Sequence, residues 1–511
     1  MKFLCNLTNR LAFKKQLVFC CLVLLTLCCR VNALSNEGTN FDVVLAGGTV
    51  MDPESGLNAI RNIGITDGKI AMIATNELQG SQVVDVAGLI VTSGFIDLHA
   101  HGQNNNDNRL QIHDGVTTAL ELEDGMFPIK GNLKYRANNA LINFGYSASH
   151  LAARAVVLNP SIHLKSGIRH DDLLSGPAAY QEFTDKQIAQ LLEVFEQQIN
   201  DGALGIGLGL EYTPGVGRKE VYRIFQFAAV KDVSIYVHIR RGPADDPSPE
   251  VELQQVQEII ALSAVTGATV HIAHLPSSSL NSATVALELI NQARKSGIKV
   301  TTEVYPYMAG STAISSALFD ENWQQRLGGI DYNNIIWTET DERLNEQTFD
   351  FHRSESIKKK LPGIVIIELI SEKSMNNVIA DPNAIIGSDG GGAHPRSTGS
   401  FSKILGKHVR IDKRLSLMDA IRKMTLLPAK QLEKTSPMMN KKGRIKVGAD
   451  ADIVVFDAKT VSDNATYKKP FELSTGIHHV FINGHHVLKN GQLAPKTYVG
   501  SAIVSDHFED K

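Results

Sequence analysis

Residues 90–102 have the sequence IVTSGFIDLHAHG, an apolar run that ends in His99 and His101. Residues i and i+2 of a β-strand point to the same face, so the two imidazoles converge on one point. A divalent cation at that point would take both of them as ligands. A lone histidine in an apolar run more often packs in the core, but two on one face favour a metal. The stretch therefore predicts half of a metal site at the end of a strand.

Seven further β-type runs follow, and helix-length amphipathic stretches alternate with them. This alternation is typical of an α/β fold, a parallel (β/α)8 TIM-like barrel with its helices outside. The long connection 311–363 predicts a lid or a small insertion over the barrel mouth. The expected helices include Asp185–Asn200, Glu250–Thr266, Ser282–Lys295 and Ser416–Lys423. The expected strands are Val91–Leu98, Thr117–Leu122, Ser147–His150, Ala203–Leu210, Ser234–Ile239, Thr269–His274, Lys299–Tyr305 and Ala384–Ser388.

Both flanks of this region consist of short β-rich runs and turns. Asp67-Gly68 between two such runs is a hairpin signal. Neither flank is large enough for a core of its own, so we expect both chain ends to form one small β-sandwich. The expected domains are a signal peptide at 1–33, sandwich parts at 34–91 and 433–511, and the metal-dependent barrel at 92–432.

Composition and charge narrow the classes of function. The chain has 511 residues, of which 43% are hydrophobic and 21% charged, and its net charge is −3. This is a globular composition, which excludes disordered and fibrous proteins. No long basic run follows the N-terminus, so nucleic acid is not an expected partner. A small-molecule substrate is expected instead, and no sequence feature indicates an oligomeric state.

The first 33 residues have the pattern of a secretory signal peptide. Four basic residues precede a 12-residue apolar stretch, 18–29, and Val31-Asn32-Ala33 follows with small residues at the cleavage positions. Twelve residues are too few for a stable membrane span, which takes about 20. All five cysteines lie in this segment, so the mature chain would have neither disulfides nor thiolate ligands. We expect export to the periplasm or secretion; the alternative is a lipoprotein anchored at Cys28.

Three further residues end β-type runs and complete the predicted site. His238 and His274 close the fifth and sixth strands, and Asp389 follows the eighth. Barrel enzymes hold their catalytic groups at this end of the strands, so we interpret both histidines as metal ligands and Asp389 as catalytic. His271 is offset by an odd number from His274 and is expected to pack behind the site. An aspartate before glycines is otherwise most often a turn residue.

The second strand offers the anion that two neighbouring cations would need between them. Carboxylates within a barrel strand are costly unless they are paired or bound to metal. Glu123 lies nearest the strand end and is the predicted bridging ligand, with Glu121 and Asp124 as alternatives. Asp97 shares a face with His99 and is expected to orient an imidazole.

These segments together resemble the amidohydrolase superfamily and, within it, the N-acyl-D-amino-acid deacylase (D-aminoacylase) branch. Each motif is weak alone, but their common order is specific and covers nearly the whole mature chain. The branch has a metal-binding cysteine after its second-strand motif, where this chain offers Glu123. It also has a lysine two residues after the sixth-strand histidine, where this chain has Pro276. The matching segments are 94–101, 115–118, 149–154, 202–212, 237–240, 270–274, 305–312, 387–390, 394–396, 399–401 and 405–406.

The resemblance implies a metal-dependent hydrolase of linear amide bonds that deacylates N-acyl amino acids, with D-type substrates favoured. The implied cofactor is Zn²⁺, as one or two divalent cations that lower the pKa of bound water toward about 7. The alternatives are a dipeptidase, a cyclic-amide hydrolase of the same superfamily, or a non-catalytic scaffold that has lost its metal. The expected metal ligands are His99, His101, Glu123, His238 and His274.

Five residues receive expected roles in this chemistry. Asp389 would accept the proton of the attacking water and deliver it to the departing nitrogen. His150 and Tyr305 would hydrogen-bond the developing oxyanion. Arg240 and Arg396 would hold a substrate carboxylate, although a solvated surface role is the alternative for both.

Overall fold

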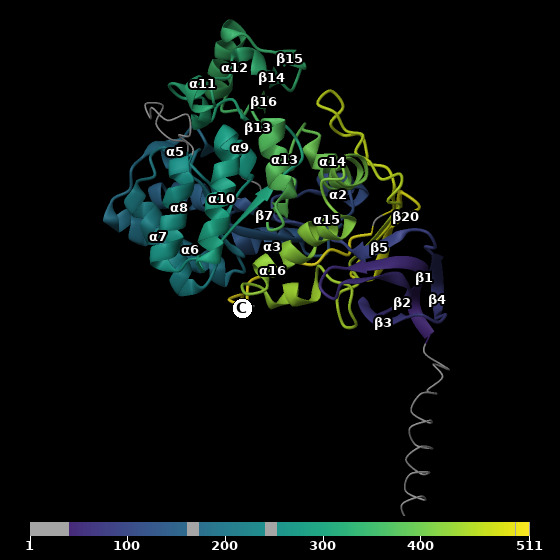
Figure 1. Ribbon diagram of the computed structural model, residues 1–511. Coiled ribbons are helices and arrows are strands. Elements are labelled where there is room, and N and C mark those ends of the chain that lie inside the picture. Colours follow the sequence, from purple (N-terminus) through teal and green to yellow (C-terminus); the bar gives the residue numbers. More distant parts are fainter. Residues whose placement is uncertain (1–39, 161–172, 241–252, 496, 510–511) are drawn as a thin grey trace, which may run out of the picture.

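The computed structural model describes residues 40–160, 173–240, 253–495 and 497–509 (Figure 1). The predicted signal peptide, residues 1–33, lies outside these ranges. The described residues form a parallel barrel sheet, a nine-stranded sheet and a small four-stranded sheet. Within the same ranges, no helix combines the length and the apolar character that crossing a bilayer requires.

The barrel consists of eight parallel strands that neighbour one another in chain order. Its first and last strands are joined by a bridge between Ala100 and Gly390 and by hydrogen bonds from Ser388 to Asp97. The sheet is therefore nearly closed, which confirms the predicted barrel. Its strands are β6 (Phe95–Asp97), β7 (Val116–Met126), β8 (Asn143–Ser149), β9 (Gly205–Gly209), β10 (Ser234–His238), β11 (Val270–Ile272), β12 (Val300–Val304) and β17 (Ile385–Ile386).

The first predicted strand, Val91–Leu98, was wrong as a single element. It is split at Gly94 into β5 (Ile90–Ser93) and β6. β5 pairs with β1 and β18 of the nine-stranded sheet, whereas β6 pairs with β7 of the barrel. A Cβ at position 94 would lie 2.2 Å from the Thr117 side chain, so only glycine lets the chain cross between the two sheets here.

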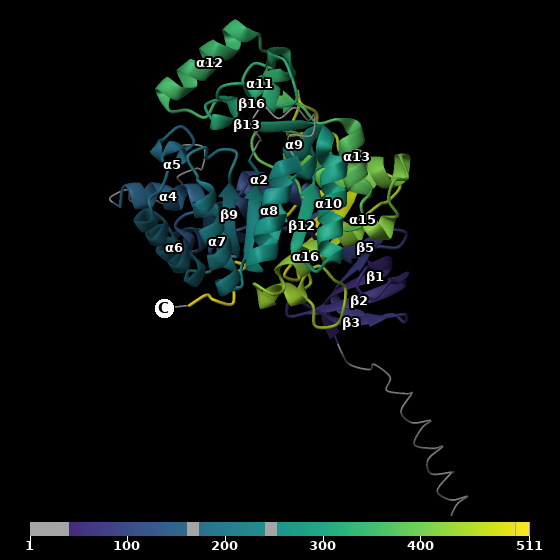
Figure 2. The ribbon, with the colours of Figure 1, turned by 60° about the vertical axis from the view of Figure 1, so that its left-hand side comes forward.

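Helices cover the outside of the barrel (Figure 2). Helix α6 (Asp185–Asn200) has the predicted bounds, because Thr184 and Gln187 form a capping box at its start. The helix predicted at 282–295 begins one residue later and ends as predicted, and the one predicted at 416–423 is displaced by one residue. Residues 250–252 of the fourth predicted helix lie outside the described ranges. The other helices of this layer are α2 (Asn105–His113), α3 (Ile129–Arg136), α4 (His150–Leu158), α7 (Arg218–Lys231), α8 (Leu253–Thr266), α10 (Ala283–Lys295), α13 (Glu372–Ala380), α15 (Leu417–Met424) and α16 (Leu426–Leu432).

The long connection after β12 forms an insertion, as predicted. Its four strands are antiparallel, in the order β13-β16-β14-β15, and it has a hydrophobic cluster of its own that Tyr212 joins from the carboxyl end of β9. This contact places the insertion at the carboxyl end of the barrel, where Figures 1 and 2 show it. The elements are β13 (Ala309–Ala313), α11 (Trp323–Arg326), β14 (Ile335–Trp337), β15 (Glu342–Arg343), α12 (Glu346–Lys359) and β16 (Ile364–Glu368).

The nine-stranded sheet combines strands from both ends of the chain, as the sequence predicts. β18 pairs with both β5 and β19, so the two chain ends meet in its middle. Asp67 and Gly68 both have positive φ in the turn between β2 and β3, which confirms the hairpin. The strands besides β5 are β1 (Asn40–Asp52), β2 (Leu57–Thr66), β3 (Lys69–Ala74), β4 (Gln79–Asp85), β18 (Ile453–Phe456), β19 (Ile477–Ile482), β20 (His485–Lys489) and β21 (Gln492–Leu493).

Candidate metal centre and active site

Six predicted site residues meet at the carboxyl end of the barrel. One ends its strand, β10, one lies within the long strand β7, and the other four follow their strands by two to four residues. Because the carboxyl ends of all eight strands open on one face, side chains far apart in sequence come into contact there. The six residues are His99, His101, Glu123, His238, His274 and Asp389.

Glu123 lies at the centre of this metal cluster. Its Oε1 is 2.9 Å from Nδ1 of His238 and 2.9 Å from Nε2 of His274. Its Oε2 is 3.0 Å from Nε2 of His99 and 3.5 Å from Nε2 of His101. Burial alone would raise the pKa of Glu123, but the surrounding imidazoles outweigh it and hold that pKa well below its usual value. The side chain is therefore an ionised carboxylate in a bridging position.

His101 and Asp389 form the more accessible side of the cluster. Nε2 of His101 lies 3.1 Å from Nε2 of His99. Oδ1 of Asp389 lies 3.4 Å from Nε2 of His99 and 3.3 Å from Nε2 of His101. The ring nitrogens and carboxylate oxygens thus face a common point rather than solvent.

The donor set fits a borderline divalent cation. Ligand atoms lie within 4.8 Å of one another in three overlapping groups. All donors are imidazole nitrogens or carboxylate oxygens, the ligands that zinc takes where no thiolate is present. The overlap would allow one cation or two, and Glu123 belongs to two of the three groups. The groups are His99–Glu123–His274, His99–His101–Asp389 and His101–Glu123–Asp124.

The alternatives to Glu123 lie on the far side of His101. Glu121 Oε2 is 2.8 Å from Nδ1 of His101, and Asp124 Oδ2 is 3.5 Å from the same nitrogen. Nδ1 and Nε2 lie at opposite edges of the ring, so Glu121 holds His101 from behind while Glu123 faces the cluster. The geometry favours Glu123 as the bridge.

Glu303, on β12, is a site residue that the sequence analysis missed. Its Oε1 lies 2.5 Å from Nδ1 of His99, and its Oε2 lies 3.2 Å from Nε2 of His271. Because the Glu303 carboxylate accepts the proton on Nδ1 of His99, Nε2 carries no proton and directs its lone pair toward the cluster. His271 packs behind the site, as predicted. Glu303 also stands inside an expected strand, so the cost of burying a carboxylate, the argument applied to β7, could have identified it.

Asp97 has a different role from the one predicted. It accepts hydrogen bonds from the backbone N–H of His99 and from the N–H and hydroxyl of Ser388, and Glu303 orients the imidazole instead. Burial raises the pKa of Asp97 to about 7, against the effect of these hydrogen bonds. Asp97 therefore joins the first barrel strand to the last.

Glu211 is a second residue that the sequence analysis missed. It follows β9, and its Oε2 lies 2.7 Å from Nε2 of His238. His238 is thus held between Glu211 and Glu123 by its two ring nitrogens. The glutamate stands in segment 202–212, which the sequence analysis singled out as a motif, but nothing in its spacing distinguished it from a loop carboxylate.

Two site residues have an unusual backbone. His274 and Asp389 both have positive φ, 28° and 52°, a region that side chains other than glycine rarely adopt. Such conformations persist where the surrounding structure fixes them, and they concentrate at functional sites. Here they aim both side chains into the cluster two and three residues after their strands end.

Arg396 and Tyr305 lie beside Asp389. Nη1 of Arg396 is 2.7 Å from Oδ2 of Asp389, and its guanidinium lies over the Tyr305 ring at 4.9 Å from the centroid. This charge and the histidines outweigh burial and lower the pKa of Asp389. Asp389 is therefore ionised at neutral pH, with one oxygen toward the histidines and the other toward Arg396.

His150 and Arg240 are directed away from the metal cluster. Nε2 of His150 lies 2.8 Å from Glu220 on α7, which Arg154 also contacts. Arg240 donates to the carbonyl of Val216 and lies 3.4 Å from a carboxylate on α8. Beyond the end of a strand, the following loop or helix sets the direction of each side chain. Both side chains therefore face the helical layer. The structure therefore does not support their predicted contacts with substrate.

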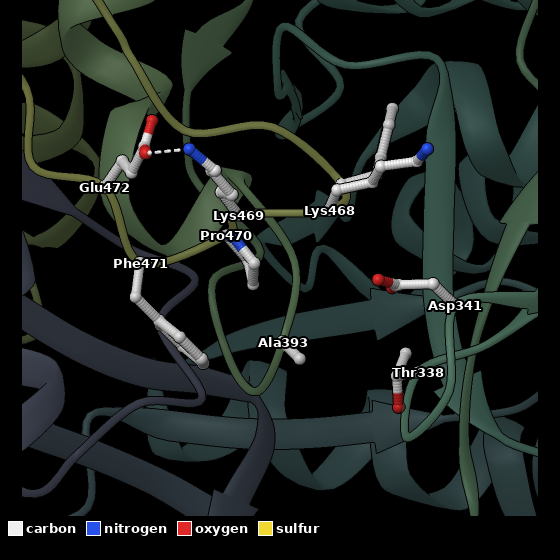
Figure 3. Close-up of a pocket in the computed structure, with 9 residues that line it drawn as sticks. Thr338, Asp341, Ala393, Lys468, Lys469, Pro470, Phe471 and Glu472 are labelled. Carbon is white, nitrogen blue, oxygen red and sulfur yellow. Dashed lines mark ion pairs between the residues drawn. The ribbon is translucent and has the colours of Figure 1, made fainter.

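A cavity of about 490 Å³ borders the segment between Asp389 and Arg396 through Ala393. One wall comes from the insertion and the other from the loop 467–472, where Lys469 and Glu472 form an ion pair (Figure 3). Apart from this ion pair, its lining combines the apolar Pro470 and Phe471 with the polar Thr338 and Asp341.

Comparison with known proteins agrees with this geometry. The chain is 29% identical over 483 residues to N-acyl-D-glutamate deacylase of Alcaligenes xylosoxydans xylosoxydans. The aligned region covers 87% of this chain and 93% of the relative. It is 27% identical to D-aminoacylase of the same organism, over 88% of this chain and 95% of the relative. The fold matches that of N-acyl-D-glutamate deacylase from Bordetella bronchiseptica, a structure solved with zinc and a phosphonate inhibitor. The TM-score is 0.73, and the sequences are 23% identical over 91% of this chain and 100% of that one. The model of the amidohydrolase family matches residues 90–487, and the chain belongs to that family.

Proposed function

We propose that the protein is a zinc-dependent deacylase of N-acyl amino acids, with D-type substrates favoured. The observation that carries the proposal is the convergence of three buried histidines, His99, His238 and His274, on the Glu123 carboxylate beside Asp389. Two relatives, an N-acyl-D-glutamate deacylase and a D-aminoacylase, support linear N-acyl amides over peptides or cyclic amides as substrates.

Zinc bound in the cluster would lower the pKa of a water molecule and polarise the scissile carbonyl. The ionised Asp389 accepts the proton of the attacking water and passes it to the departing nitrogen. Arg396 holds the second oxygen of Asp389, which keeps the first directed at the histidines. Tyr305 lies under this guanidinium, in place to donate a hydrogen bond to the oxyanion.

A substrate panel tests the proposal. The zinc-loaded protein is assayed on N-acyl-D-amino acids, their L enantiomers, dipeptides and hydantoins. We expect the highest kcat/KM for an N-acyl-D-amino acid. Faster turnover of dipeptides or hydantoins would replace the proposal with the corresponding alternative, and no turnover of any substrate by fully loaded protein would favour a scaffold.

We also propose that the protein is exported and that residues 1–33 are removed, leaving a periplasmic or secreted enzyme. The basic start, the apolar stretch 18–29 and the small residues before position 34 support this. Expression of the whole chain followed by N-terminal sequencing tests it. The expected mature protein begins at Leu34 in the exported fraction, and an intact N-terminus in the cytoplasmic fraction would contradict the proposal.

A further inference from the structure

Two histidines outside the metal cluster face each other on the nine-stranded sheet. Nδ1 of His479, on β19, lies 3.1 Å from Nε2 of His486, on β20. The register places His486 opposite Phe481, which shares a face of β19 with His479. His486 stacks on the Phe481 ring, with centroids 4.1 Å apart and planes 18° apart. The two imidazoles are therefore fixed on one face of the sheet.

Gln82 holds the far edge of the His486 ring. Its side-chain amide lies 3.1 Å from Nδ1 of His486, and it comes from β4, in the N-terminal part of the sheet. The amide oxygen and nitrogen of glutamine exchange places by a flip. With the oxygen toward the ring, Gln82 accepts the Nδ1 proton, and Nε2 of His486 then presents its lone pair toward His479. Metal-binding histidines generally have a partner of this kind behind them.

We propose that His479 and His486 form a second metal site for a late first-row divalent cation, with Cu²⁺ bound most strongly. A pair of imidazoles completed by water suits Cu²⁺ and Ni²⁺, and Cu²⁺ has the higher affinity in the usual order of these metals. On binding, the His486 proton moves from Nε2 to Nδ1, where Gln82 accepts it, and none is released. The bound cation links β19 to β20, while Gln82 connects them to β4.

The surroundings of the pair agree with this assignment. Burial and the neighbouring histidine lower the pKa of His486 to about 3, and burial and His478 lower the pKa of His479. Both rings are therefore neutral at pH 7 and can bind a cation through a lone pair. At Nδ1 of His479 the cation would displace a long hydrogen bond, 3.4 Å, from the backbone N–H of Asn490. The positive charge of Lys489, the register partner of His479, opposes a cation, so the affinity is lower than that of the metal cluster in the barrel.

Copper binding by the zinc-loaded full-length protein tests the proposal. We expect the wild type to bind one equivalent of Cu²⁺ more than His479→Ala or His486→Ala, with nitrogen hyperfine splitting in its EPR spectrum. Zinc content and hydrolytic activity should be equal in all three, because neither residue belongs to the metal cluster. His485→Ala is the matched control, since His485 is exposed and lies opposite Ile482, and it should keep the extra equivalent.

Equal copper binding by the wild type and both alanine variants would overturn the proposal. Crystals of the wild type soaked in Cu²⁺ provide a measurement that does not depend on the folding of a variant. An anomalous peak about 2 Å from both Nδ1 of His479 and Nε2 of His486 supports the site, and its absence at saturating copper refutes it. Neither result depends on which amide the barrel hydrolyses.

Discussion

Glu303→Gln tests how a buried carboxylate behind His99 supports the metal centre. Glutamine has nearly the same volume and keeps an acceptor for one imidazole N–H, but it removes the negative charge. The side chain lies 2.5 Å from His99 and 3.2 Å from His271, and all three residues are buried. The substitution therefore alters the charge behind a ligand without removing a ligand or opening a cavity.

The size of the effect follows from these contacts. A hydrogen bond to a charged group contributes about 1.5–3 kcal/mol, which corresponds to roughly 10- to 150-fold in an equilibrium constant. Glutamine keeps part of this through its carbonyl oxygen, so we expect a loss of about 10- to 100-fold in zinc affinity, the range typical of residues behind metal ligands.

Competition with a chromophoric chelator measures the zinc affinity, and circular dichroism checks the fold. The matched control is Glu258→Gln, which removes a carboxylate that pairs with Arg240 outside the cluster and should leave the zinc affinity unchanged. A folded Glu303→Gln protein with zinc affinity within about twofold of the wild type would refute the reasoning, because the carboxylate would then not support His99.

Three further predictions concern other parts of the molecule. Asp389→Asn should keep its zinc, measured by mass spectrometry, yet lose at least about 100-fold in kcat, since the amide cannot accept a proton; unchanged turnover would remove Asp389 from catalysis. Gly207→Ala would place a Cβ 2.4 Å from the Glu123 carbonyl oxygen. We expect a loss of about 1–3 kcal/mol in stability, measured by thermal melts, and a lower zinc content, measured by metal analysis. A melt like that of the wild type would contradict this. Burial lowers the pKa of Lys423 to about 7. Between pH 7 and about 10 the unfolded chain therefore binds one more proton at this lysine than the folded chain does. The free energy of unfolding should rise with pH in this range by up to ~1.4 kcal/mol per pH unit. Lys423→Met should abolish this rise in apparent Tm, and an equal pH dependence in both proteins would argue against a neutral Lys423.

The convergence of the candidate ligands and Asp389 could be predicted because the pattern of a parallel barrel constrains it strongly. His99 and His101 share a face by strand alternation, and His238, His274 and Asp389 each stand where an apolar run ends. Position at a strand end is visible in sequence, and the closed sheet brings such positions together whatever their separation along the chain.

The direction of a side chain after a strand end could not be predicted in the same way. Ser149 caps α4, so His150 is already the first helical residue, and the helix turns it toward Glu220 on α7. Arg240 similarly turns toward Glu258 on α8. Once strand alternation stops, the next element sets the direction, and its first turn is the part that sequence patterns determine least.

The metal cluster lies across the seam of the barrel. β17 has two residues and pairs with β12, so its contact with β6 depends on Ser388 donating to Asp97 and on the bridge beyond them. His99 and Asp389 stand on opposite sides of this seam, with Nε2 and Oδ1 only 3.4 Å apart. A cation bound by His99 would attract the Asp389 carboxylate across this seam, so metal binding and closure of the barrel are expected to be coupled.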